Sequence, residues 1–266
     1  MFKQRLLMTL ILIPLVLGLI FYAPSMVFAG FLLCLCVGMS YEWQQFFCLT
    51  HFNQVWFKTF LIAFGAILVC LLHAFFIYVD LLFWCVALVL IISYPRYKHY
   101  CAYTGFVATN AWLLLGVSLA ILYEWQGTAT GRLQLLAVLF LVWGADIGAY
   151  LAGKAWGKHK MIPQVSPGKS VEGLMGGMLL VAILAACEIY YFDPFSALQW
   201  FVVSMITGLF SVFGDLWISL LKRQVGLKDT GHLIPGHGGL LDRLDSLLAA
   251  LPIFYFGINI LGGSGA

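Results

Sequence analysis

Long apolar stretches alternate with short polar segments along almost the whole chain. A membrane-spanning helix needs about 20 consecutive, mostly apolar residues. Nine stretches approach this length, at 6–22, 25–44, 56–78, 81–95, 103–123, 133–151, 171–192, 197–221 and 241–260. The mean hydropathy of +0.99 is too high for a soluble globular domain, which could not bury so much apolar surface. The pattern therefore predicts an all-α, polytopic membrane protein with about nine transmembrane helices.

The basic residues predict how these helices are oriented. If the chain crosses the membrane nine times, Arg132 lies on one side of the membrane and the rest of the 14 Lys and Arg lie on the other. Loops on the cytoplasmic side of membrane proteins are enriched in Lys and Arg. We therefore expect a cytoplasmic amino terminus, with most charged loops on the same side.

The two ends of the chain have interpretations of their own. Lys3 and Arg5 precede an apolar core, and Val27-Phe28-Ala29 resembles a signal-peptide cleavage site. The length of that core, and the span that follows it, favour a membrane helix over a signal peptide. Residues 262–266, Gly-Gly-Ser-Gly-Ala, are interpreted as a remnant of an expression vector.

Polar residues divide the rest of the chain into two parts. Residues 1–132 contain five spans with few polar groups, and we predict that they form a scaffold. Glu42 is interpreted there as an acid at the cytoplasmic end of a helix. Residues 133–261 are predicted to contain the catalytic helices and cytoplasmic loops. The seven cysteines include no CxxC pair and are predicted to be buried apolar residues.

Asp146 is an acid inside a predicted span, beside glycines that are spaced for close helix contact at 144, 148, 153 and 157. A carboxylate facing lipid would be costly, so Asp146 should face either a neighbouring helix or a wet cavity. The basic loop that follows contains Ser166-Pro167-Gly168-Lys169-Ser170. It is not a P-loop, because Pro163 stands where that motif needs glycine. We expect the first-turn N–H groups of the next helix to be free for a phosphate.

The densest group of charges lies between Gly214 and Ser246, which include four of the 11 acidic and four of the 14 basic residues. Charges gathered beside apolar spans, in a chain with only 9% charged residues, indicate a functional site. The polar positions of the span 197–221 and its end form one helical stripe, at Ser211, Asp215, Ser219 and Lys222. A glycine-rich connection follows, and the next helix begins with Asp242 and Asp245 on neighbouring parts of one face.

Carboxylates gathered at a membrane interface repel one another unless a cation joins them. Mg²⁺ suits such a place, since it binds one or two carboxylates plus substrate phosphates. A zinc site at His232 and His237 is disfavoured because no cysteine accompanies them. His237 is predicted to contact phosphate or to organise its loop. Lysines, acids and a hard metal together match phosphoryl-type transfer. The net charge of +3 suits anionic lipid or nucleotide phosphates, with no indication of nucleic acid binding.

The chain resembles the phosphatidate cytidylyltransferases, also called CDP-diglyceride synthetases. The residues that match the family signature are Ser219, Lys222-Arg223, Lys228-Asp229, Gly231, Pro235, His237-Gly238-Gly239, Asp242-Arg243 and Asp245. Two positions depart from many members. Ile218 stands where they have an acid, and Gly168 stands where they have lysine. The second departure places more of the expected anion binding on Lys169.

The resemblance implies that CTP and phosphatidic acid react to give CDP-diacylglycerol and pyrophosphate in phospholipid synthesis. It implies Mg²⁺, with K⁺ beside it, in a homodimer embedded among membrane lipids of the bacterial inner (cytoplasmic) membrane, with the active site facing the cytoplasm. The expected catalytic residues are Asp215, Ser219, Lys222, Asp242 and Asp245. Of these, Asp215 and Asp242 would hold the metal. The expected substrate-binding residues are Asp146, Ser166, Lys169, Arg223, Lys228, His237 and Arg243.

Two other functions fit parts of this pattern. A transporter or ion pathway could use Asp146 and Asp215, although the acids gather toward one face and no inverted repeat is apparent. A CTP-dependent polyprenol kinase would need similar groups, and a product assay separates it from the cytidylyltransferase. A CDP-alcohol phosphotransferase is disfavoured because the chain contains no Asp-Gly dipeptide.

Overall fold

The computed structural model describes residues 2–47, 52–96, 103–192, 196–231, 233 and 238–260. Helices dominate these segments, because a backbone in lipid must satisfy its own hydrogen bonds. They are α1 (Phe2–Tyr22), α2 (Ser25–Trp43), α3 (Phe52–Leu71), α4 (His73–Ile92), α6 (Thr104–Gln126), α7 (Ala129–Trp156), α8 (Val171–Phe192), α9 (Ala197–Gln224) and α10 (Leu241–Tyr255). A short 3₁₀ helix, Gln44–Phe47, extends α2, and a π-helical turn, Phe256–Ile260, extends α10.

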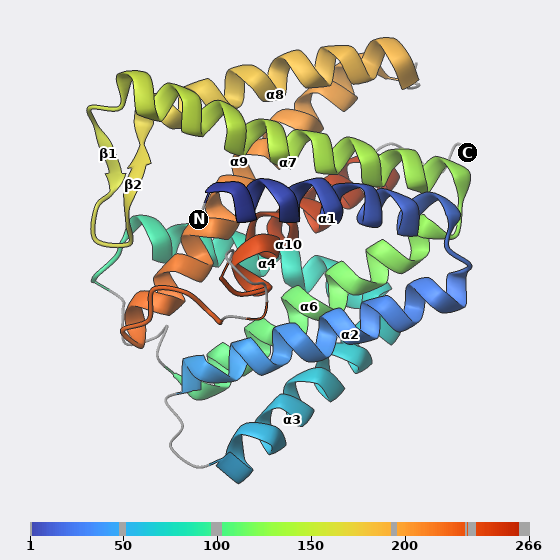
Figure 1. The fold of residues 1–266 in the computed structure, drawn as a ribbon, viewed down its shortest axis with the longest axis vertical. Coiled ribbons are helices and arrows are strands. Elements are labelled where there is room, and N and C mark those ends of the chain that lie inside the picture. Colours follow the sequence, from blue (N-terminus) through green and yellow to red (C-terminus); the bar gives the residue numbers. More distant parts are fainter. Residues whose placement is uncertain are drawn as a thin grey trace.

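Six helices of the described segments are long and apolar enough to cross a membrane: Ser25–Phe47, His73–Ile92, Thr104–Gln126, Ala129–Trp156, Val171–Phe192 and Ala197–Gln224. The chain is thus a largely helical, multi-pass membrane protein, and the count of nine spans and the orientation stay predictions. The amino-terminal end of α1, the β1–β2 hairpin and the carboxy-terminal end of α9 lie at one side of the molecule (Figure 1). This arrangement is the one expected if the basic loops share a side.

The predicted boundary between the third and fourth apolar stretches is wrong. The sequence placed it between 78 and 81, whereas α3 ends at Leu71 and α4 begins at His73. The apolar run continues without Gly or Pro across this region, so hydrophobicity alone marks no end. Two polar residues interrupt this run. Asp80, at the predicted boundary, is buried inside α4, whereas His73 lies at the observed one, with its Nε2 3.1 Å from Glu124 Oε2 and its Nδ1 3.3 Å from Cys70 O.

A small sheet forms within the basic loop that was expected before α8. β1 (Lys160–Ile162) pairs antiparallel with β2 (Ser166–Ser170), with Lys160 opposite Ser170. Val165, in the turn, is fully buried, and its N–H donates a hydrogen bond to Ile162 O at 3.1 Å. The hairpin is the exception to an otherwise helical structure within the described segments, and it carries Lys169.

Small residues bring the helices around Asp146 into close contact, as predicted. A Cβ on Gly148 of α7 would lie 2.5 Å from Gly176 O of α8, so neither helix tolerates a larger residue there. Helices in lipid gain little from hydrophobicity and associate through such close packing. The same device joins α9 to α10, where a Cβ on Gly214 would lie 2.9 Å from Ala249 Cβ. These contacts determine where the next polar residues, Asp146 and Asp215, are placed.

Candidate active site

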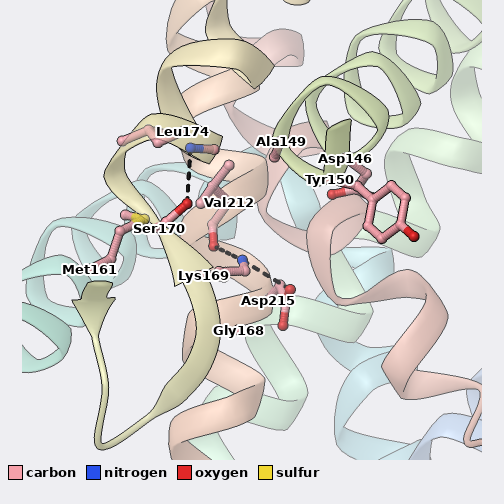
Figure 2. A pocket seen from close by; sticks show the side chains of 11 residues that line it. Asp146, Ala149, Tyr150, Met161, Gly168, Lys169, Ser170, Leu174, Val212 and Asp215 are labelled. Atoms are coloured by element: carbon pink, nitrogen blue, oxygen red, sulfur yellow. Dashed lines mark hydrogen bonds and ion pairs between the residues drawn. The ribbon is translucent and has the colours of Figure 1, made fainter. Parts of the chain in front are cut away.

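A cavity lies between α7, α8, α9 and β2, and polar groups from three of these elements line it. Its lining includes Asp146, Tyr150, Met161, Lys169, Ser170 and Asp215. Figure 2 shows Asp146 and Tyr150 coming from α7, while Lys169 of β2 and Asp215 of α9 point toward each other beside β2. The structure therefore brings together Asp146 of α7, Lys169 of the basic loop and Asp215 of α9.

Asp215 is held by partners on two elements. The Lys169 ammonium on β2 lies 2.9 Å from Asp215 Oδ2 and also donates to Val212 O at 3.0 Å (Figure 2). One turn along α9, the Ser219 hydroxyl donates to Asp215 Oδ1 at 3.1 Å. The predicted polar stripe of α9 is thus confirmed for this pair. The hairpin adds a positive charge that the helical pattern could not reveal.

Asp242, in the first turn of α10, forms a second ion pair, with Lys222. Lys222 Nζ donates to Asp242 Oδ1 at 2.7 Å, and the two side chains are 10% and 9% exposed. The other oxygen, Oδ2, accepts the backbone N–H groups of Thr230 at 2.8 Å and Gly239 at 3.2 Å. Asp242 therefore joins the end of α9 to two points of the connection that leads into α10.

Asp245 is 7% exposed and lies one turn further into α10. Its Oδ1 accepts the neighbouring Ser246 N–H at 2.7 Å. It interacts electrostatically with Asp215, and also with Lys169 and Lys222. Two carboxylates and two ammonium groups thus share one small volume where α9 meets α10.

Asp146 faces this group from α7. It interacts electrostatically with Lys169, Asp215 and Arg243. Asp146 lines the cavity, as the cost of a carboxylate facing lipid predicted, and its role in the site stays a prediction. Arg243, on the exposed side of α10, is thereby linked to the same cluster.

The remaining predicted substrate-binding residues surround the cluster less closely. Arg223 donates to Val165 O at 3.2 Å and to Leu227 O at 3.3 Å, so it ties the hairpin turn to the end of α9. Lys228 is exposed on the connection after α9. Ser166, at the start of β2, is half-buried and is not among the residues that line the cavity. His237 lies outside the described residues.

The expectation of free N–H groups at the start of α8 is wrong for two of the donors. Val171 N–H donates to His159 O at 2.8 Å, and Gly173 N–H donates to the Ser170 hydroxyl at 3.1 Å. The Ser170 contact is a local cap of a kind that the sequence could have indicated. The His159 contact depends on the hairpin, which brings His159 back to the start of the helix. A phosphate at this end of the cavity would therefore rely chiefly on Lys169.

Glu42 is the polar residue whose importance the sequence underestimated. It comes from the half predicted as scaffold, yet it is 1% exposed and contacts the start of α10. The available signal was a lone acid at the end of a long apolar stretch, but its partners lie almost 200 positions away.

The carboxylates fit a hard divalent cation. Within the described segments, no three His, Cys, Asp or Glu side chains form a metal-binding group of their own. Mg²⁺ needs less, because it takes one or two carboxylates and completes its shell with water and substrate phosphates. Asp215 and Asp245 interact electrostatically, while Asp215 Oδ2 is paired with Lys169 and Asp242 Oδ1 accepts from Lys222.

Comparison with known proteins places this site in a family. A sequence model described as the Cytidylyltransferase family matches residues 3–261. A phosphatidate cytidylyltransferase of Pseudomonas aeruginosa is 38% identical over 292 aligned positions, which cover 96% of each chain. That of Haemophilus influenzae is 35% identical, over 98% of this chain and all of the relative. A Staphylococcus aureus phosphatidate cytidylyltransferase is 40% identical over 147 positions, about half of each chain. Matched over nearly its full length by the family and by two of these relatives, the chain belongs to the cytidylyltransferase family.

Proposed function

We propose that the chain is a phosphatidate cytidylyltransferase, which joins CTP and phosphatidic acid to give CDP-diacylglycerol and pyrophosphate. One observation supports this reaction most directly: the described structure gathers Lys169, Lys222, Asp215 and Asp245 at the meeting of α9, α10 and the hairpin. Two polyanionic substrates need positive charge to approach each other, and the relatives' names supply their identity.

The proposed chemistry is a single substitution at phosphorus. A phosphate oxygen of phosphatidic acid forms a bond to the α-phosphorus of CTP, while the bond from that phosphorus to the bridging oxygen breaks and pyrophosphate leaves. A phosphate monoester has a second pKa of about 6, so the attacking oxygen is already anionic at neutral pH. The protein therefore needs no general base. Its task is to position the reactants and to offset their charge.

The lysines are the groups that meet the phosphates. Each is paired with a carboxylate in this structure, Lys169 with Asp215 and Lys222 with Asp242. Each lysine must loosen its contact with that carboxylate to bind a phosphate oxygen well, so we propose that the two pairs open when substrates bind. Lys169 lies on the cavity wall and is assigned to one substrate, while Lys222 lies at the α9–α10 junction, where the second can approach.

We assign Mg²⁺ to Asp215 together with a carboxylate of α10. The family resemblance implies Asp242 as the partner, but Asp242 accepts a hydrogen bond from Lys222. Asp245 interacts electrostatically with Asp215, and within the described segments no lysine ammonium group lies within hydrogen-bonding distance of it. The ion, when bound, would neutralise phosphate charge and stabilise the departing pyrophosphate. K⁺, a homodimer, and a bacterial inner-membrane location with the active site facing the cytoplasm are further proposals from the resemblance.

Purified full-length protein, labelled CTP, Mg²⁺ and phosphatidic acid in detergent micelles test the function. We expect lipid-soluble cytidine and an equal amount of pyrophosphate. Asp215→Asn should abolish the product, whereas Glu188→Gln, a buried carboxyl whose Oε2 accepts from Trp200 Nε1 at 3.0 Å, should retain it. Phosphorylated polyprenol from CTP would instead identify a kinase. Ion flux in liposomes that lack CTP would identify a transport protein.

A further inference from the structure

Glu42 lies near the end of α2, with both carboxylate oxygens directed at the beginning of α10. Its Oε1 accepts the backbone N–H of Leu240 at 2.8 Å. Its Oε2 accepts the N–H of Leu241 at 2.8 Å and the hydroxyl of Thr230 at 2.9 Å. Three donors on one buried carboxylate explain how a charged group can lie 1% exposed.

Two of these donors belong to the unpaired end of a helix. The first N–H groups of any α-helix have no partner within the helix. The N-cap residue of α10 is Leu240, which has no polar side-chain atom, and α10 has no side-chain cap hydrogen bond of its own. Glu42 supplies that cap from another helix, and its negative charge is favourable at a helix amino terminus.

The same carboxylate contacts the connection between α9 and α10 at two separate points. A Cβ on Gly231 would lie 2.7 Å from Glu42 Oε1, and one on Gly239 would lie 2.6 Å from Oε2. Both glycines therefore let the backbone pack directly on the carboxylate. Gln45, also near the end of α2, donates to Thr230 O at 2.6 Å and strengthens the attachment.

These attachment points are the ones that hold Asp242. Thr230 and Gly239 each donate a backbone N–H to Asp242 Oδ2. Glu42 binds the side chain of Thr230 and packs against Gly239. Asp242 in turn holds Lys222 through its other oxygen. A chain of direct contacts thus runs from α2 to the ammonium group assigned to a phosphate.

We propose that Glu42 is a positioning residue of the active site, which fixes the start of α10 so that Asp242 and Lys222 are held ready for substrate. The role of Glu42 in catalysis rests on the proposed function. Glu42 itself touches no substrate: it acts through Thr230, Gly239 and the first N–H groups of α10. The half of the chain predicted as scaffold therefore contributes to the site.

Glu42→Gln in the full-length protein is the test. The amide keeps the shape of the side chain but replaces one acceptor oxygen with an NH₂ group, which faces a donor whichever way it turns. We expect kcat to fall by about 10²-fold, as for a misplacement of about 1 Å at a reacting centre. KM for the substrate that Lys169 binds should change little, because Lys169 and β2 are untouched. Hydrogen exchange measured by mass spectrometry should quicken at residues 239–241 and not in α7.

Glu188→Gln is the matched control, since Glu188 is a buried carboxyl (5% exposed) whose Trp200 contact an amide oxygen can preserve. It should keep wild-type kcat and exchange. Thr230→Val removes the hydroxyl donor alone and should cause a smaller change in the same direction, which keeps the test decisive if Glu42→Gln does not fold.

Wild-type kcat, or wild-type exchange at residues 239–241, in folded Glu42→Gln would overturn the proposal. So would faster exchange in α7 to the same extent, which indicates a general loss of stability. If the wild-type protein makes no CDP-diacylglycerol, the proposed function fails, while the exchange result still decides whether Glu42 fixes the start of α10.

Discussion

Gly214 lets α9 approach α10 closely enough to place Asp215 beside Asp245, and Gly214→Ala should separate them. The added Cβ would fall inside the contact distance of Asp245 O and 2.9 Å from Ala249 Cβ. Carbon atoms in contact lie about 3.5 to 4.0 Å apart. The helices must therefore move apart by about 0.6 to 1.1 Å, on the backbone segment that carries one of the two carboxylates.

The stability and the activity of this variant should respond differently. Overpacking of this kind costs about 1 to 3 kcal/mol, while replacing a helical Gly by Ala returns about 1 kcal/mol. We therefore expect a folded protein with a net loss of about 0 to 2 kcal/mol in free energy of unfolding. A misplacement of about 1 Å among catalytic groups reduces a rate by about 10²-fold. The turnover number should fall far more than the stability does.

The assay combines kcat for CDP-diacylglycerol formation with thermal unfolding in the same detergent. Gly30→Ala in α2 is the control, because a Cβ there meets nothing within 4 Å, and its rate should equal that of the wild type. A wild-type kcat in Gly214→Ala would refute the reasoning, since it would mean that the close approach of α9 and α10 has no part in positioning the carboxylates.

Three further predictions concern the ion pairs and the metal. Lys222→Met leaves Asp242 buried without its partner and should cost about 3 to 5 kcal/mol in the free energy of unfolding. The double variant with Asp242→Asn should regain part of that stability but not activity, because the neutral amide needs no ammonium partner and its oxygen can still accept from Thr230 and Gly239. A stable single variant would contradict this. Lys169→Met should lower kcat/KM by about 10²- to 10³-fold, with partial recovery in Lys169→Arg, and equal losses in both would argue against a role for its charge. Asp245→Asn should raise the Mg²⁺ concentration for half-maximal rate by about tenfold or more, because the ion would keep one carboxylate of two. An unchanged Mg²⁺ requirement would remove Asp245 from the metal site.

The local sequence was sufficient to predict most of the helices and part of the site. A backbone in lipid must close its own hydrogen bonds, so a long apolar stretch has little choice but to be helical. The helical repeat then places Ser219 one turn from Asp215, and the structure shows the hydrogen bond between them. The glycine spacing around Asp146 likewise predicted the tight contact of α7 with α8.

Other features depend on which surfaces meet, and no local pattern contains that information. Lys169 finds Asp215 because the β1–β2 hairpin folds over the end of α9, and Glu42 finds Leu241 across 199 positions of sequence. The same cause accounts for the wrong end of α3, where His73 is drawn to Glu124 on α6. Periodicity describes one element at a time. The pairing of a charge with a distant partner is decided by how closely, and at what rotation, two helices pack, and that is settled only when the whole bundle is assembled.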